Sequence, residues 1–298
     1  MRRFDLPGGG ESEAARDGSL YFVGTATTLI RFGGFSLLTD PNFLHQGERV
    51  HLGYGLHSTR RTEPACQLED LPPYDFVLLS HLHEDHFDRE VERRLPRGTR
   101  IVTTPKAART LARRGFRAAE GLREWEPVEF ARGACRLRVT AMPGRHGPMA
   151  VASLLPPVMG SMLEFGHMEY GLLLRMYISG DTLVYETLRE IPQRFAGIDC
   201  AILHLGGTRV MGVLVTMDGK QGVELMRIVQ PDVAVPIHYD DYTVFKSPLG
   251  EFAREVREAG LEHRVRYIAR GETLTIPNRV ALARGTGAGL YEPEPAPF

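Results

Sequence analysis

The segment 76–88 limits the fold of this chain more than any other stretch. Its first four residues, Phe-Val-Leu-Leu, predict a strand that is buried on both faces. The sequence Ser-His-Leu-His-Glu-Asp-His follows directly. Because side chains alternate along an extended chain, His81 and His83 are expected to point the same way. A buried strand that ends in this manner predicts a metal site at its carboxyl end.

The turn after this strand can bring Asp85 and His86 to the same point in space. Imidazole and carboxylate groups suit zinc, iron or manganese. Histidine is sparse elsewhere, with 11 in 298 residues, so composition does not explain the cluster. The alternative interpretation is a solvated polar loop, which would leave the convergence of these side chains without a cause.

Composition and charge exclude several classes of protein. The chain is 43% hydrophobic and 24% charged, as expected of a globular protein with a sizeable core. Its net charge of −1 provides no basic field, so no nucleic-acid partner is expected. No apolar run is long enough for a membrane span and no signal peptide is evident. We therefore expect a cytoplasmic enzyme with a small-molecule substrate, and a homo-oligomer remains open.

Cysteine usage adds one further exclusion. Cys66, Cys135 and Cys200 are widely separated and form no CxxC pair. Neither a disulfide framework nor a thiolate zinc site is therefore indicated.

Strands and helices alternate along the chain in two similar halves. Strands are expected at 20–24, 27–32, 35–39, 76–79, 100–103, 160–165, 171–179, 199–205 and 233–237, with two more within 122–141. Helices are expected at 88–95, 104–114, 183–191, 219–229 and 249–259. We expect a flexible arm at 1–18, one domain over 19–285 and a tail at 286–298. The loops 41–75 and 147–160 have no clear period and are expected to form walls of a site.

Three later strand ends also carry metal-type residues. His146 lies in Pro-Gly-Arg-His-Gly-Pro, Asp181 lies in Ser-Gly-Asp-Thr, and His238 follows Val-Pro-Ile. Taken alone, Asp181 would be an ordinary turn residue and His238 a packed core histidine. Their order after the first motif favours a shared site.

This order of motifs resembles the metallo-β-lactamase superfamily over about residues 20–275. The segments Gly-Thr-Ala-Thr-Thr-Leu-Ile from Gly24 and Val-Pro-Ile-His-Tyr ending at Tyr239 narrow the resemblance. They are similar to the branch of ascorbate-6-phosphate lactonase-like and N-acylphosphatidylethanolamine phospholipase D-like proteins. The resemblance implies an α/β (α+β) fold, a four-layer αββα sandwich with the site at the strand ends between two sheets.

The resemblance also implies a centre with two metal ions. One ion would be held by three histidines: His81, His83 and His146. The other would be held by Asp85, His86 and His238. Asp181 would bridge the two ions. Two divalent ions are expected, with zinc ahead of manganese or iron. The ligand set itself, which is all nitrogen and oxygen, does not select zinc over the other two. A hydroxide bridging such ions is a nucleophile at neutral pH.

The function expected from these features is that of a binuclear metal-dependent hydrolase. The bridging hydroxide would attack an ester, lactone or phosphoester centre, as in a lactonase or phosphodiesterase. Asp85 and His204 are the candidate catalytic residues, and His204 at a strand end would protonate the leaving group. Arg145, Tyr239 and Asp240 are the candidate substrate contacts.

Other functions stay open on the same scaffold. These are an iron-dependent oxidoreductase such as a sulfur dioxygenase, a nuclease or phosphodiesterase, and a binding module with an incidental metal. Two departures from the resembled branch bear on the substrate: Thr25 stands where histidine is common, and Asp240-Asp241 stands where Gly-Thr is usual. Carboxylates beside the metals would repel an anionic substrate.

Overall fold

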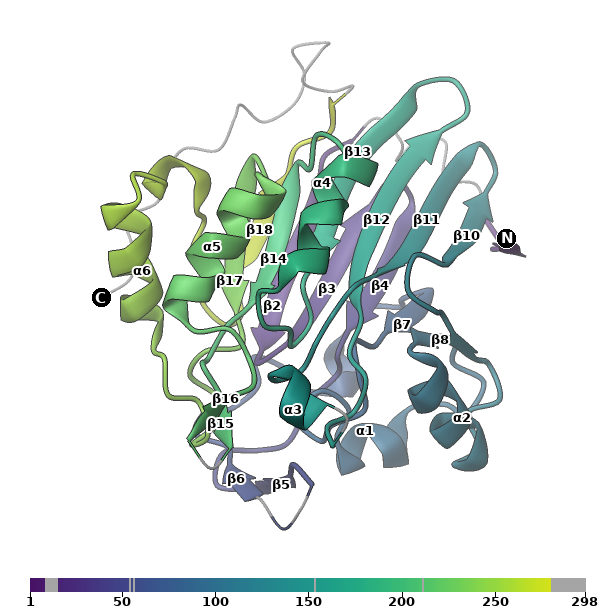
Figure 1. Cartoon of the computed structure of the whole chain (residues 1–298). Helices are drawn as coiled ribbons and strands as arrows, with labels where there is room; N and C mark the ends of the chain where they lie inside the picture. The colour runs from purple at the N-terminus through teal and green to yellow at the C-terminus, as the bar shows by residue number, and fades with distance from the viewer. Residues whose placement is uncertain (9–15, 54, 56, 153, 211, 280–298) are drawn as a thin grey trace.

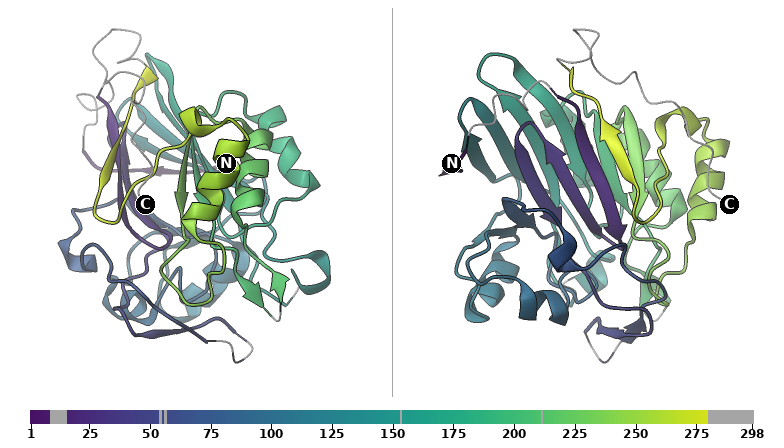
Figure 2. Two further views of the ribbon diagram at one scale, coloured as in Figure 1. Left: turned by 90° about the vertical axis from the view of Figure 1, so that its left-hand side faces the viewer. Right: turned by 180° about the vertical axis from the view of Figure 1, so that it is seen from behind.

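The computed structural model describes residues 1–8, 16–53, 55, 57–152, 154–210 and 212–279. Within these residues, two mixed seven-stranded sheets pack face to face, and helices cover both outer faces (Figures 1 and 2). The predicted four-layer αββα sandwich is therefore confirmed. None of the helices in the described ranges is both long enough and apolar enough to cross a membrane.

The strands of each sheet come from both halves of the chain. In spatial order the first sheet contains β1 (Arg2–Asp5), β10 (Pro127–Arg132), β11 (Cys135–Met142), β12 (Gly160–His167), β13 (Gly171–Ile178), β14 (Cys200–His204) and β17 (Val233–Ile237). The second contains β18 (Thr273–Ile276), β2 (Gly18–Gly24), β3 (Thr27–Phe32), β4 (Phe35–Thr39), β7 (Phe76–Leu78), β8 (Ile101–Thr103) and β9 (Ala119–Gly121). Short hairpins are formed by β5 (Arg49–His51) with β6 (His57–Thr59) and by β15 (Arg209–Val210) with β16 (Val213–Leu214).

The two faces of each sheet bury different clusters. In β7, Phe76 and Leu78 point between the sheets, whereas Val77 points toward the helices. The second sheet is covered by α1 (Arg89–Arg94) and α2 (Pro105–Arg113), and the first by α4 (Glu190–Arg194), α5 (Gly219–Val229) and α6 (Leu249–Glu258). A strand that is buried on both faces has a continuous run of apolar residues, and the run at 76–79 predicts a strand for this reason.

Local signals in the sequence agree closely with the observed turns and caps. Gly33 and Gly34 join β3 to β4 with φ of 56° and 81°, values that favour glycine. The Asp88 carboxylate accepts a hydrogen bond from the backbone N–H of Val91 and caps α1. Thr104 caps α2 in the same way, immediately before Pro105 at the first helical position.

Two local predictions are wrong. Part of the expected flexible arm, Arg2–Asp5, is strand β1, which pairs in parallel with β10. The expected helix 183–191 is replaced by a 3-10 turn at Glu186–Arg189 followed by α4. Thr182 does not cap a helix, because its Oγ1 accepts a hydrogen bond from the backbone N–H of Arg145. Residues 9–15 of the arm and the tail 286–298 lie outside the described residues.

The strand directions place the motifs at one edge of the sandwich. Strands β13, β14 and β17 are parallel, and so are β4, β7 and β8. Carboxyl ends of parallel strands meet at the same edge of a sheet, which is where ligands bind in such folds. This edge also carries α3 (Met149–Ala152) and the two short hairpins (Figure 1).

Candidate metal centre

Strand ends from both sheets bring the seven predicted metal ligands together. They fall into two groups, and within each group the ligand atoms lie within 4.8 Å of one another. The first group is His81, His83 and His146, and the second is Asp85, His86, Asp181 and His238. The division is the one that the family resemblance implied, except that the structure places Asp181 with the second group.

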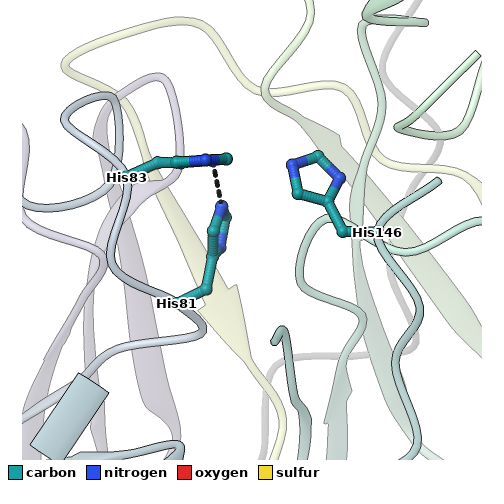
Figure 3. A group of neighbouring side chains, drawn as sticks. All are labelled: His81, His83 and His146. Atoms are coloured by element: carbon teal, nitrogen blue, oxygen red, sulfur yellow. Dashed lines mark hydrogen bonds between the residues drawn. The ribbon is translucent and has the colours of Figure 1, made fainter. Parts of the chain in front are cut away.

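The three histidines of the first group face one another across the gap between the sheets (Figure 3). His81 Nε2 and His83 Nδ1 are 3.0 Å apart. His146 lies opposite, and its Nδ1 is 2.8 Å from the carbonyl oxygen of Val215. That carbonyl accepts the Nδ1–H, so the Nε2 lone pair of His146 is available to a cation.

The second group combines two carboxylates with two imidazoles. His86 Nε2 is 3.3 Å from Asp181 Oδ2, and His238 Nε2 is 3.6 Å from Asp85 Oδ2. The Nδ1 of His238 is 3.1 Å from the carbonyl oxygen of Leu205, which holds the ring. All four side chains are buried.

Several atoms of the second group have no hydrogen-bond partner among the described residues. These buried atoms are Asp85 Oδ1, His86 Nε2, Asp181 Oδ1 and His238 Nε2. An unpaired buried polar atom costs about 1–3 kcal/mol, so a native fold rarely leaves several at one point. Nitrogen and oxygen atoms that converge in this way fit a divalent cation.

Burial and neighbouring charges hold the three histidines of the first group, and the carboxylate of Asp181, in the protonation states that bind metal. Burial, together with the nearby His146, lowers the pKa of His83 to about 3. Burial and the adjacent His86 and His83 hold the pKa of His81 well below its usual range. Although burial alone would raise the pKa of Asp181, the neighbouring His238 and His86 lower it well below the ordinary value. Neutral imidazole and ionised carboxylate are the forms that ligate cations.

These shifts predict how the metal-free protein responds to acid. The pKa values of His81, His83, His146 and His204 are all lowered in the fold. Between the ordinary histidine pKa of about 6.5 and the lowered values, the unfolded chain binds more protons, so stability falls as pH falls. His86 and His238 have raised pKa values and oppose the trend only near pH 6.5, where they are fewer than the four histidines with lowered values. Thermal melts of chelated protein should show a lower Tm at pH 5 than at pH 6.5, and an unchanged or higher Tm would contradict this account.

Asp40 is a site residue that the sequence prediction missed. It ends β4, is 2% exposed, and its Oδ2 lies 3.0 Å from His86 Nδ1. Its carboxylate also accepts hydrogen bonds from the backbone N–H of Ser80 at 2.6 Å and from Ser80 Oγ at 2.8 Å. The charge of His86 and the contact with His204 overcome burial and lower the pKa of Asp40 to about 2. Asp40 therefore orients His86 with its Nε2 toward the centre.

The structure gives His204 a different place from the one expected of a proton donor. His204 is fully buried at the end of β14, and its Nε2 lies 3.4 Å from Asp40 Oδ2. Its backbone N–H donates to Ser179 Oγ at 2.9 Å. It thus contacts the same carboxylate oxygen, Asp40 Oδ2, that holds His86. This geometry fits a positioning residue and not direct donation of a proton to a leaving group.

Replacing His204 tests this positioning role. We expect His204→Phe to weaken metal binding about 10- to 100-fold, since it removes the contact with Asp40. His204→Gln keeps a hydrogen-bond donor and should therefore lose less metal affinity than His204→Phe. Competition against a chromogenic chelator measures the affinity. If either variant kept wild-type metal affinity but lost kcat, His204 would instead act as the proton donor.

The three candidate substrate contacts are engaged elsewhere. The Arg145 guanidinium stacks over the Tyr185 ring, 4.3 Å from its centroid. Tyr239 packs against the apolar cluster beneath α5 and α6. Asp240 accepts a hydrogen bond from Arg270 Nη1 at 2.9 Å. The contacts that the structure gives these side chains do not support their predicted role as substrate contacts.

The two positions at which this chain departs from the resembled branch, Thr25 and Asp240-Asp241, contact each other. Thr25, with φ of 53°, donates its backbone N–H to Asp241 Oδ2 at 2.8 Å. Asp241 is fully buried and also accepts from Arg270 Nη1 at 3.0 Å. Arg270 thus offsets both adjacent carboxylates, Asp240 and Asp241. The expected repulsion of an anionic substrate is therefore reduced.

A second residue missed by the sequence prediction holds the carboxylate of Asp181. Thr216 is fully buried, and its Oγ1 donates to Asp181 Oδ2 at 3.2 Å. The preceding residue, Val215, supplies the carbonyl that holds His146. No sequence pattern marks this segment, because its contribution depends only on the tertiary approach of the chain after β16.

Comparison with known proteins agrees with the fold and the motifs. A family model described as "Beta-lactamase superfamily domain" matches residues 37–239, more than half of the chain. A UPF0173 metal-dependent hydrolase of Methanopyrus kandleri is 25% identical over 252 residues, covering 85% of this chain and 97% of that protein. Another from Nanoarchaeum equitans is 24% identical over 209 residues, covering 65% of this chain and 83% of that protein.

Solved structures show the same architecture. An isothiocyanate hydrolase from Delia radicum gut bacteria has a TM-score of 0.74 and 22% identity, covering 86% of this chain and 98% of that one. A possible metal-dependent hydrolase from Veillonella parvula has a TM-score of 0.72 and 18% identity, covering 88% and 99%. The chain therefore belongs to the β-lactamase superfamily domain family, which confirms the superfamily but not the narrower branch.

Proposed function

We propose that this metal-dependent hydrolase of the metallo-β-lactamase fold uses two divalent ions to cleave an ester, lactone or phosphoester of a small molecule. The observation that carries the proposal is the pair of ligand groups, one of three histidines and one whose members are all buried and whose unpaired atoms converge. Three imidazoles would hold one ion; Asp85, His86 and His238 would hold the other. Asp181 would bridge them, since its charge offsets the repulsion between two cations.

Bound divalent ions in such a centre supply Lewis acidity and lower the pKa of a coordinated water. The protein's own residues set the geometry for that chemistry. Asp40, Val215 and Leu205 accept the outward-facing Nδ1–H groups of His86, His146 and His238, and so fix the tautomers. With His204 placed behind Asp40, we assign protonation of the leaving group to solvent water.

A substrate with a carbonyl or phosphoryl centre fits this arrangement better than a polynucleotide does. The net charge of −1 supplies no general field for a nucleic-acid backbone. Arg270 offsets part of the charge of Asp240 and Asp241, which reduces the repulsion of an anionic small molecule there. Zinc is the ion we expect, ahead of manganese or iron.

Metal analysis and a substrate panel together test the proposal. The panel contains esters, lactones, phosphomonoesters, phosphodiesters, acyl amides and an isothiocyanate, the last because of the structural relative named above. We expect two zinc or manganese ions per chain and hydrolysis of at least one ester-type substrate without oxygen uptake. One iron per chain with oxygen consumption would overturn the proposal in favour of an oxidoreductase.

A further inference from the structure

A cavity of about 420 Å³ adjoins the metal centre on the side of α1 and α2. Its walls come from both loops that the sequence marked as candidate walls: His51, Leu52 and Gly53 from 41–75, and Leu154 and Pro156 from 147–160. The metal-binding motif itself contributes Leu82, His83 and Glu84. A volume of this size accommodates a small organic molecule.

His83 joins the cavity to the candidate metal centre. Of the seven candidate metal ligands, His83 alone is partly exposed, while the other six are buried. His83 also lines the cavity. A molecule seated there would therefore reach the first group of ligands at His83.

Among the described residues, one cation and one carboxylate of the cavity, Lys106 and Glu84, have no ion-pair partner. Arg114 Nη1 pairs with Glu92 at 2.8 Å, and Arg89 Nη2 pairs with Glu48 at 2.6 Å. The Glu84 carboxylate accepts the backbone N–H of His51 at 2.6 Å. Lys106, the second residue of α2, lines the same cavity and has no carboxylate within 4.0 Å in the described part of the chain.

Apolar side chains line part of the cavity beside the charged groups and the two histidines. They are Leu52, Leu82, Phe87, Leu154 and Pro156. Such a lining binds an uncharged hydrocarbon segment, while a single charged group at one end fixes orientation.

We propose that this cavity is the substrate pocket and selects small molecules with an apolar body and one anionic group, carboxylate or phosphate, held by Lys106. The scissile group would then lie beside His83, and the anionic group would lie away from the metal centre. This proposal rests on the hydrolase function proposed above and specifies the substrate class for it.

Paired esters that differ in one charge test the pocket. 4-Nitrophenyl butyrate is neutral, and mono-4-nitrophenyl glutarate carries a free carboxylate on a similar chain. Relative to wild type, Lys106→Glu should raise KM for the glutarate ester about 10-fold with kcat nearly unchanged, and Lys106→Arg should restore it. KM for the butyrate ester should change less than about 2-fold. An equal change for both esters, or none, would overturn the proposal.

Lys220→Glu is the matched control, because Lys220 is also the exposed second residue of a helix but does not line this cavity. It makes the same change in net charge and should leave both KM values unaltered. A glutarate-specific rise in KM for this variant would mean that overall charge, and not the pocket, selects the anion.

A binding measurement separates the pocket from the hydrolase function. Calorimetry with the metal-loaded protein compares 5-phenylvalerate with its neutral amide, 5-phenylvaleramide. Tighter binding of the carboxylate that Lys106→Glu abolishes supports the pocket even if no ester is cleaved, in which case the hydrolase proposal fails alone. Ester cleavage accompanied by carboxylate binding that does not depend on Lys106 would overturn the pocket alone.

Discussion

Replacing Asp181 with asparagine is expected to lower kcat/KM about 10³-fold and to release at least one metal ion per chain. Asp181 is 2% exposed and lies within 3.6 Å of both His86 and His238, so its charge is central to the second group. Asparagine keeps the shape and one acceptor oxygen but removes the negative charge that offsets two cations. The measurements are metal content by elemental analysis and kinetics on the most active substrate of the panel.

The control for this experiment is Asp5→Asn, which makes the same chemical change on β1, where Asp5 pairs only with neighbouring Arg3 in the contacts described. Metal content and activity should match wild type within about 2-fold, as for most surface substitutions. Full activity and two bound ions in the Asp181→Asn protein would show that this carboxylate does not bridge the ions. The carboxylate that bridges the ions would then have to be that of Asp85.

Much of the fold could be predicted because its strands are buried on both faces. The run at 76–79 and the strand at Val233–Ile237 have no polar alternation, and each ends in a residue of the metal centre. The motif after the run at 76–79 predicted a metal site by itself, and the order of the later strand ends favoured a site shared with His146, Asp181 and His238. The two glycines between the predicted strands 27–32 and 35–39 form the expected two-residue turn, which places Phe32 opposite Phe35.

The residues that hold the ligands could not be predicted, because they are distant in sequence. Asp40 contacts His86 across 46 positions, and Val215 contacts His146 across 69. Such contacts depend on which strands are neighbours, and the sequence does not fix that order by itself. Asp40 did carry one signal, since Asp-Pro ends a buried strand, but a turn residue explains the same pattern equally well.

The position of a residue in the sequence does not determine which way its side chain points, as His204 and Tyr239 show. The sequence placed His204 correctly at the end of a strand, yet its ring contacts Asp40 behind the ligands. Tyr239 follows His238 directly, and the left-handed backbone of His238, with φ of 63°, breaks the alternation of β17 and places Tyr239 on the helix-covered face of the sheet. Proximity in sequence to a ligand is therefore weak evidence for a substrate contact.

Removal of the two metal ions is expected to lower the Tm by about 12–32 °C at pH 7.5. Each ion held at 100 to 1,000 times its Kd stabilises the fold by about 3–4 kcal/mol, and for a chain of this size 1 kcal/mol corresponds to about 2–4 °C. Without the ions, the unpaired atoms of Asp85, His86, Asp181 and His238 stay buried at the junction of the two sheets. Thermal melts before and after chelation, with zinc added back as the control, measure the effect. Because Asp181→Asn removes one buried charge, chelation should lower the Tm of this variant less than it lowers the Tm of wild type. Equal melting temperatures with and without metal would show that metal binding does not stabilise the fold.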